Sequence, residues 1–222
     1  MSKATVIMVQ ARLDSSRLPV KALHDLGGKP LVSRVMETLS ALSCDSRVLV
    51  CDQASLQALA PFARMQSWEV FAGDRDNVLG RFCAAARHHG AAIIVRATGD
   101  NPLVSVEAAA ACVEALVSAE ADHCRMDGLA HGGGVEVVRA SRLFALEAGS
   151  PSDWEREHVC PGIWQHPERY RCIVLEAPEH LRFPKVRMTL DTPDDYQVLR
   201  RYWALSPTPG YVDFCTRMHH EA

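Results

Sequence analysis

The chain has 222 residues, of which 48% are hydrophobic and 23% are charged. These proportions are typical of a globular protein and exclude disordered, collagen-like and coiled-coil sequences. The formal net charge of −3 argues against a broad basic face for a nucleic acid polymer. The sequence contains no apolar run long enough to predict a membrane span. None of the eight cysteines forms a CxxC pair, which favours unpaired thiols in a reducing cytoplasm.

The first half of the sequence predicts strands and helices in alternation. The apolar run at 4–9 is typical of a strand buried on both faces. Apolar residues at helical spacing then predict a helix over 30–42. Further strands are predicted over 47–51, 69–71 and 92–96, and further helices over 54–66, 76–89 and 106–119. This rhythm predicts an α/β fold with a mostly parallel twisted sheet and helices on both faces, and ligands at the carboxyl ends of its strands.

The second half is less regular. Strands are predicted over 135–138 and 170–176, and residues 188–191 are predicted to end a third strand. Helices are predicted over 140–148 and from Pro193 to about Leu205, and the segment 152–165 is predicted to form one helix or two short ones. No shift in composition divides the chain, so we expect a single domain over 1–222.

The loop after the first strand is basic. Residues 10–34 contain five arginines and lysines and two acids, which is a local excess of positive charge in an acidic protein. Arg12 and Arg17 have the forked geometry that binds phosphate oxygens, and Lys21 supplies a compact charge. The loop matches neither a Walker motif nor GxGxxG. The positive charge of this segment is explained equally well by a solvated basic loop that binds no phosphate.

Two aspartates follow predicted strands. Asp100 lies in the segment Thr98-Gly-Asp-Asn-Pro102, and Asp191 precedes the helix that Pro193 opens. Such a pair is suited to hold one Mg²⁺ ion beside the basic loop, because this hard cation binds through one or two carboxylates plus substrate phosphates. Ordinary roles also fit, since Asp100 suits a turn and Asp191 or Thr192 suits a helix cap.

Further titratable residues lie in the second half. Glu136 interrupts an apolar strand, where alternation would aim it into a cleft or, on an edge strand, into water. Glu155 and His158 are three residues apart and share a helix face. A solvated helix start, capped by Ser152 or Asp153, explains the second group as well.

Together these segments resemble a known family. The pattern Ala11-Arg-x4-Arg17-Leu-Pro-x-Lys21, followed by Gly28-Lys-Pro, resembles the opening of the cytidylyltransferases that activate acidic sugars, such as the CMP-sialate and CMP-Kdo synthetases. The similarity is greater to the branch of the spore-coat polysaccharide biosynthesis protein F (SpsF). That branch is indicated by Gln10-Ala-Arg, Gly73-Asp-x-Asp-Asn-Val-Leu-x-Arg81, Arg96-x-Thr-Gly-Asp100-x-Pro-Leu, Val135-Glu136-Val, Glu155-Arg-Glu-His158-Val-x-Pro161 and Thr189-Leu-Asp191-Thr-Pro-Asp-Asp-Tyr196.

The resemblance implies a nucleotidyltransferase of the glycosyltransferase-A-like fold. It would be a Mg²⁺-dependent cytoplasmic cytidylyltransferase that transfers CMP from CTP to an acidic sugar, or to a related phosphate or phosphonate acceptor, and releases pyrophosphate. The implied pathway is the biosynthesis of a surface polysaccharide or secondary metabolite. Residues 1–125 would form the nucleotide-binding half, and residues 126–222 would bind the acceptor and complete the metal site. The resembling synthetases are commonly dimers, which leaves a homodimer open.

The resemblance also implies roles for single residues. Nucleotide binding would fall to Gln10, Ala11, Arg12, Ser15, Arg17, Lys21, Arg81 and Thr98. The metal ligands would be Asp100 and Asp191, and the residues toward the acceptor would be Glu136, Glu157 and His158. The catalytic set would be Arg17, Lys21, Asp100 and Asp191.

Two departures from the family pattern keep alternatives open. Val20 stands where the family has glycine, and Cys51-Asp-Gln53 replaces a threonine-rich strand end, so another nucleoside triphosphate is an alternative to CTP. A second alternative is a glycosyltransferase of the same fold, which would use an Asp-x-Asp motif. The segment Asp74-Arg-Asp76 matches this motif, although Asp76 fits better as the cap of the next helix. A nucleotide-binding protein without turnover is the third alternative.

Overall fold

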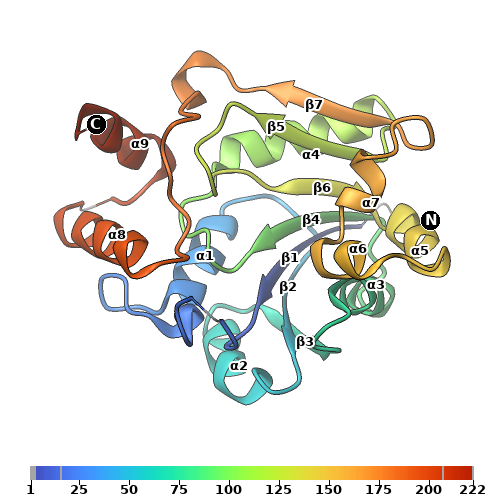
Figure 1. Cartoon of the computed structure of the whole chain (residues 1–222), viewed down its shortest axis with the longest axis horizontal. Coiled ribbons are helices and arrows are strands. Elements are labelled where there is room, and N and C mark those ends of the chain that lie inside the picture. The colour runs from blue at the N-terminus through green and yellow to red at the C-terminus, as the bar shows by residue number, and fades with distance from the viewer. Residues whose placement is uncertain (1–3, 16, 207, 222) are drawn as a thin grey trace.

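The fold is built on one mixed sheet. The computed structural model describes residues 4–15, 17–206 and 208–221, and in it seven strands pair in the order β3-β2-β1-β4-β6-β5-β7 (Figure 1). The strands are β1 (Thr5–Ala11), β2 (Ser46–Asp52), β3 (Glu69–Gly73), β4 (Ile93–Thr98), β5 (His123–Asp127), β6 (Glu136–Arg139) and β7 (Cys172–Glu176). Strands β1 to β4 are mutually parallel, and so are β5 and β7, whereas β6 runs antiparallel to both of its neighbours. The sheet is therefore mostly parallel, as predicted.

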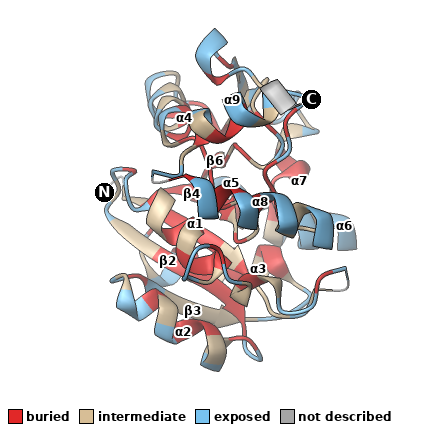
Figure 2. Cartoon of the chain, turned by 90° about the vertical axis from the view of Figure 1, so that its left-hand side faces the viewer, coloured by how far each residue is buried: buried red, intermediate tan, exposed pale blue. Residues whose placement is uncertain are grey.

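Each face of the sheet is covered by helices. Alternation along β1 sends Ile7 and Val9 into one core and Val6 and Met8 into the other. The first core packs against α1 (Leu31–Leu39), α2 (Leu56–Met65), α4 (Val106–Ser118), α8 (Pro193–Leu205) and α9 (Tyr211–Glu221). The second packs against α3 (Val78–His88), α5 (Ala140–Ala148) and α7 (Pro161–Trp164). Figure 2 shows buried residues along the strands, while α6 (Asp153–His158) and α8 are largely exposed.

Several predicted elements need correction. The segment 188–191 is not the end of a strand, because the backbone nearby forms only an isolated bridge between His131 and Arg187. The side chain that caps α3 is that of Asn77, which accepts a hydrogen bond from the Gly80 amide, and not that of Asp76. The segment 152–165 does form two short helices, which is one of the two predicted forms, and Val159, with a positive φ of 71°, lies between them. Strand β5 and helix α9 were not predicted.

Two composition-based expectations can be compared with the structure. All eight cysteines are unpaired, and six of them are buried, as predicted. Among the described helices, none has both the length and the apolar character needed to cross a bilayer.

Candidate functional site

The carboxyl ends of β1 and β4 lie unusually close together. Gln10 and Thr98 are register partners, and the Gly99 amide then donates a 2.7 Å hydrogen bond to the Gln10 carbonyl oxygen. A Cβ atom at Gly99 would lie 2.8 Å from that oxygen, so a residue without a side chain is required there. This approach brings Asp100 directly beside the basic loop that follows β1.

A cavity of about 320 Å³ opens over these strand ends. It brings together most of the residues expected to bind ligands: Gln10, Ala11, Arg12, Ser15, Arg17, Lys21, Thr98, Asp100, Glu157, His158 and Asp191. Asp14, Ala22, Arg96 and Gly99 complete the lining. Segments far apart in sequence therefore meet at one edge of the sheet, where an open α/β fold binds ligands.

Lys21 stands at the centre of the charged groups. It begins a short 3-10 helix, η1 (Lys21–Leu23), and its Nζ atom donates hydrogen bonds to Asp100 Oδ2 at 2.7 Å and Asp191 Oδ1 at 2.9 Å. Arg17 Nη2 lies 3.1 Å from the same Asp191 oxygen, and Arg187 Nη2 donates to the other oxygen at 2.9 Å. Two carboxylates thus converge on a single cation between them.

Asp191 is placed by a helix cap and not by a strand end. Thr192 caps α8, and its hydroxyl accepts from the Asp195 amide, while Asp195 Oδ2 accepts from the amides of Asp191 and Thr192. The Leu190 amide also donates to the Asp100 carbonyl oxygen at 2.9 Å. The cap and this link fix the two aspartates relative to each other.

Both carboxylates of the α8 cap are held ionised. Burial would raise the pKa of Asp191, but hydrogen bonding to Lys21 and the charges of Lys21 and Arg17 outweigh it and lower the pKa. The same balance operates at Asp195, where burial is opposed by the Arg187 hydrogen bond and by backbone amides, and the pKa falls to about 2. Ionised carboxylates are what a bound cation requires.

Asp195→Asn should therefore lower stability in a pH-dependent way. The folded protein depresses this pKa from 3.8 to about 2, so the ionised carboxylate stabilises the fold above pH 3.8 and loses this effect as the pH falls toward 2. We expect a deficit of about 2 kcal/mol near neutral pH, which shrinks on acidification. Urea unfolding at a series of pH values measures it. The exposed neighbour Asp194, changed to Asn, is the matched control, and a deficit that stays constant with pH would contradict the assignment.

Val20 keeps the backbone conformation that glycine would adopt. Its φ and ψ are 50° and 29°, in the left-handed region, and its amide donates to the Leu13 carbonyl oxygen at 3.1 Å to close the loop. This conformation costs a β-branched residue about 1–2 kcal/mol. The substitution of glycine by valine therefore leaves the turn before Lys21 intact.

Two of the predicted site residues lie outside the cavity lining. Arg81 is 1% exposed, and its Nη1 donates to the Asp74 carbonyl oxygen at 2.8 Å. Glu136 lies behind Arg96, whose Nη1 donates to Glu136 Oε2 at 2.6 Å. Burial would raise the pKa of Glu136, but contact with His123 and the charge of Arg96 lower it to about 2.

Two cationic residues of the site were missed. Arg96 lines the cavity and Arg187 binds Asp191, yet neither was assigned a role from sequence. A charged residue at the end of the apolar run 92–96 was a usable signal for Arg96. Arg187 lies in an irregular segment, where no periodicity of the sequence indicates which way its side chain points.

The chain is similar to known proteins over most of its length. The family model described as cytidylyltransferase matches residues 6–220. The spore coat polysaccharide biosynthesis protein SpsF of Bacillus subtilis (strain 168) is 33% identical over 207 residues, covering 88% of this chain and 84% of the relative. A cytidylyltransferase structure from Leptospira borgpetersenii has a TM-score of 0.89 at 25% identity, covering 99% of this chain and 95% of the other.

A further solved structure shares the fold. It is the CMP:2-keto-3-deoxy-manno-octonic acid synthetase complexed with CTP, with a TM-score of 0.69 at 16% identity, covering 90% of this chain and 98% of the other. At this identity the likeness concerns the arrangement of the chain alone.

Proposed function

The chain belongs to the cytidylyltransferase family, and we propose that it transfers the CMP group of CTP to an acidic sugar or a related phosphate or phosphonate acceptor, with release of pyrophosphate. The observation that carries the proposal is the convergence of Asp100 and Asp191 on Lys21 beside the basic loop. The resemblance to SpsF supports a place in the synthesis of a surface polysaccharide or a secondary metabolite. The family description, cytidylyltransferase over residues 6–220, supports the choice of CTP as the nucleotide.

The loop after β1 would hold the triphosphate. Arg12, Arg17 and Lys21 line the cavity together with Ser15, so phosphate oxygens would meet two guanidinium groups, an ammonium group and a hydroxyl. Transfer of this kind depends on positioning and charge neutralisation more than on covalent help from the protein. The acceptor oxygen would form a bond to the α-phosphorus while the bond to the pyrophosphate oxygen breaks.

Asp100 and Asp191 fit a divalent cation. The Lys21 ammonium group shows that one positive centre is contacted by an oxygen of each carboxylate, at 2.7 and 2.9 Å. Oxygen ligands of this type suit Mg²⁺, which we propose as the cofactor. When bound, the ion would supply charge neutralisation to the phosphate oxygens.

The acceptor would bind on the α6 side of the cavity. Glu157 and His158, at the end of α6, line the cavity beside the basic loop, and Glu157 Oε1 lies 3.9 Å from Arg12 Nη2. Glu136 would act from behind, through Arg96. In this proposal residues 1–125 form the nucleotide-binding half and residues 126–222 the acceptor half of one catalytic domain. Eight unpaired thiols support a reducing cytoplasm as its compartment.

The test is a product assay. The purified protein is incubated with CTP, Mg²⁺ and a panel of acidic sugars and sugar phosphonates, and released pyrophosphate is measured; UTP, GTP and ATP are run in parallel. We expect pyrophosphate with CTP and one acceptor, and a CMP-linked product. Transfer of a sugar from an added nucleotide-sugar donor, without pyrophosphate release from CTP, would identify a glycosyltransferase instead. Binding of CTP without pyrophosphate from any acceptor would identify a nucleotide-binding protein without turnover.

A further inference from the structure

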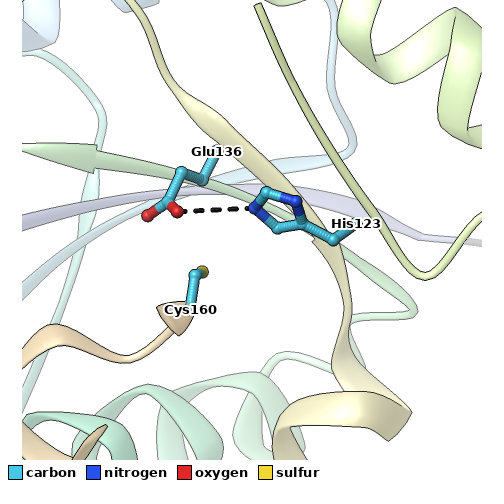
Figure 3. Close-up of side chains that lie close together, drawn as sticks. All are labelled: His123, Glu136 and Cys160. Atoms are coloured by element: carbon cyan, nitrogen blue, oxygen red, sulfur yellow. Dashed lines mark ion pairs between the residues drawn. The ribbon is translucent and has the colours of Figure 1, made fainter. Parts of the chain in front are cut away.

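Behind the catalytic cavity, three side chains of different chemistry face one another. They are His123 on β5, Glu136 on β6 and Cys160 between α6 and α7 (Figure 3). One ligand atom from each lies within 4.8 Å of those of the other two. His123 and Cys160 are fully buried, and the side chain of Glu136 is 20% exposed. An imidazole, a carboxylate and a thiol therefore lie together in the interior of the protein.

The buried imidazole lacks hydrogen-bond partners. Neither Nδ1 nor Nε2 of His123 makes a hydrogen bond of ordinary geometry with the described residues; Nε2 has only an ion-pair contact of 3.4 Å with Glu136 Oε1, an oxygen that also accepts from Trp164 Nε1 at 3.2 Å. A buried polar atom left without a partner costs about 1–3 kcal/mol, and such atoms in native proteins often mark an absent water or ion. His123 Nε2 is aimed at the oxygen and toward the thiol, so a ligand between them would supply the missing interaction (Figure 3).

We propose that His123, Glu136 and Cys160 bind a divalent transition-metal ion, with zinc as the best match. Nitrogen, oxygen and thiolate donors are the set that zinc takes, at bonds of about 2.0–2.3 Å. Donors at such bond lengths in tetrahedral geometry lie about 3.4 Å apart, which equals the distance between His123 Nε2 and Glu136 Oε1. The Cys160 sulfur lies within 4.8 Å of both other donors and would move closer to complete the three-donor face.

The surroundings of the three donors suit this ion. Arg96 holds the second oxygen of Glu136 at 2.6 Å, as outer-shell groups commonly orient a carboxylate ligand. Three protein donors leave the fourth position of a tetrahedral ion to a water molecule. This donor set includes a soft thiolate and an imidazole, whereas Asp100 and Asp191 offer oxygen alone and suit Mg²⁺. The two sites therefore select different ions.

The consequence of metal binding would be structural. The ion would tie β5 and β6 to the α6–α7 junction, which directly follows Glu157 and His158. It would also fix Glu136, and through it the Arg96 guanidinium group that lines the cavity. The proposal stands independently of the proposed reaction, because it requires no nucleotide.

The first test is metal content. The protein is expressed with zinc in the medium and dialysed against excess Mg²⁺, which occupies the all-oxygen site, and its zinc is measured by mass spectrometry. We expect stoichiometric zinc in the wild type and in Asp100→Asn, and its loss in Cys160→Ser. Cys83→Ser is the matched control, because Cys83 is a buried thiol of the same core on α3 and should leave the zinc in place.

The second test identifies the ligand atom. Cobalt substitution should give a thiolate-to-cobalt absorption band in the wild type and in Cys83→Ser that is absent from Cys160→Ser. Zinc should also raise the melting temperature of the metal-free wild type but not that of Cys160→Ser. Wild-type protein without zinc and without the cobalt band would overturn the proposal and leave a hydrogen-bonded carboxylate cluster. Zinc that survives in Cys160→Ser but disappears in Asp100→Asn would overturn it as well.

Discussion

Replacing Asp100 by asparagine should lower kcat for pyrophosphate release by about 100-fold or more. The change keeps the size of the side chain but removes one of the two negative charges that converge at the position of the Lys21 ammonium group. Loss of one preorganised electrostatic contact in an active site typically costs 100- to 1000-fold in kcat. Asp191→Asn should have an effect of similar size, since its carboxylate is the second member of the pair. Steady-state kinetics with CTP and the accepted sugar measure both.

The control for these variants is Asp127→Asn. Asp127 is a half-exposed residue at the end of β5 whose recorded side-chain contact is with Arg125, outside the cavity. It should retain the wild-type rate. Circular dichroism shows whether each variant is folded. A folded Asp100→Asn variant with the wild-type rate would show that this carboxylate does not take part in the reaction.

Lys21→Met should have two opposite effects. With CTP, kcat should fall by about 100- to 1000-fold, because the ammonium group that neutralises the phosphates is lost. Without nucleotide, Mn²⁺ should bind about tenfold more tightly, because Lys21 no longer competes for the Asp100 and Asp191 oxygens at 2.7 and 2.9 Å. Electron paramagnetic resonance of free Mn²⁺ measures the second effect. Methionine preserves most of the side-chain volume, so the comparison isolates the charge.

The matched control for the lysine is Lys185→Met. Lys185 is exposed and lines a different surface cavity, so its removal should change neither kcat nor the Mn²⁺ affinity. A Lys21→Met variant that binds Mn²⁺ as weakly as the wild type would show that the ammonium group and the metal do not share a position. A parallel loss of kcat and of Mn²⁺ binding would indicate that the variant has lost its local fold.

The parallel part of the fold was predictable because its signals are local. Buried strands such as β1 read as continuous apolar runs, and each is followed by an amphipathic helix. Strand β5, with the sequence His-Cys-Arg-Met-Asp, offers neither a run nor a clean alternation, since its last residues are half-buried or exposed. The antiparallel insertion of β6 between β4 and β5 depends on pairing across the sheet, which no local pattern records.

The site was predictable to the extent that its residues follow β1 and β4. The parallel register aligns Gln10 with Thr98, so the basic loop and Asp100 meet as expected from strand ends. Asp191 also lines the cavity, but the capping box of α8 places it there and not the strand end that was predicted. Arg187 could not be assigned, because its direction depends on the Asp195 and Asp191 carboxylates that it contacts. The roles of all the predicted site residues in binding and catalysis remain predictions.

The position of Lys21 also has a consequence for how the protein folds. Its two carboxylate partners lie 79 and 170 residues further along the chain. These contacts therefore join residues that are far apart in sequence, and such contacts form slowly. During synthesis the first strands and helices can pair early, but the ammonium group meets both partners only after Asp191 has been made and α8 has docked. The ability to bind the cation and the triphosphate together is thus acquired at the end of folding, and partly folded chains lack it.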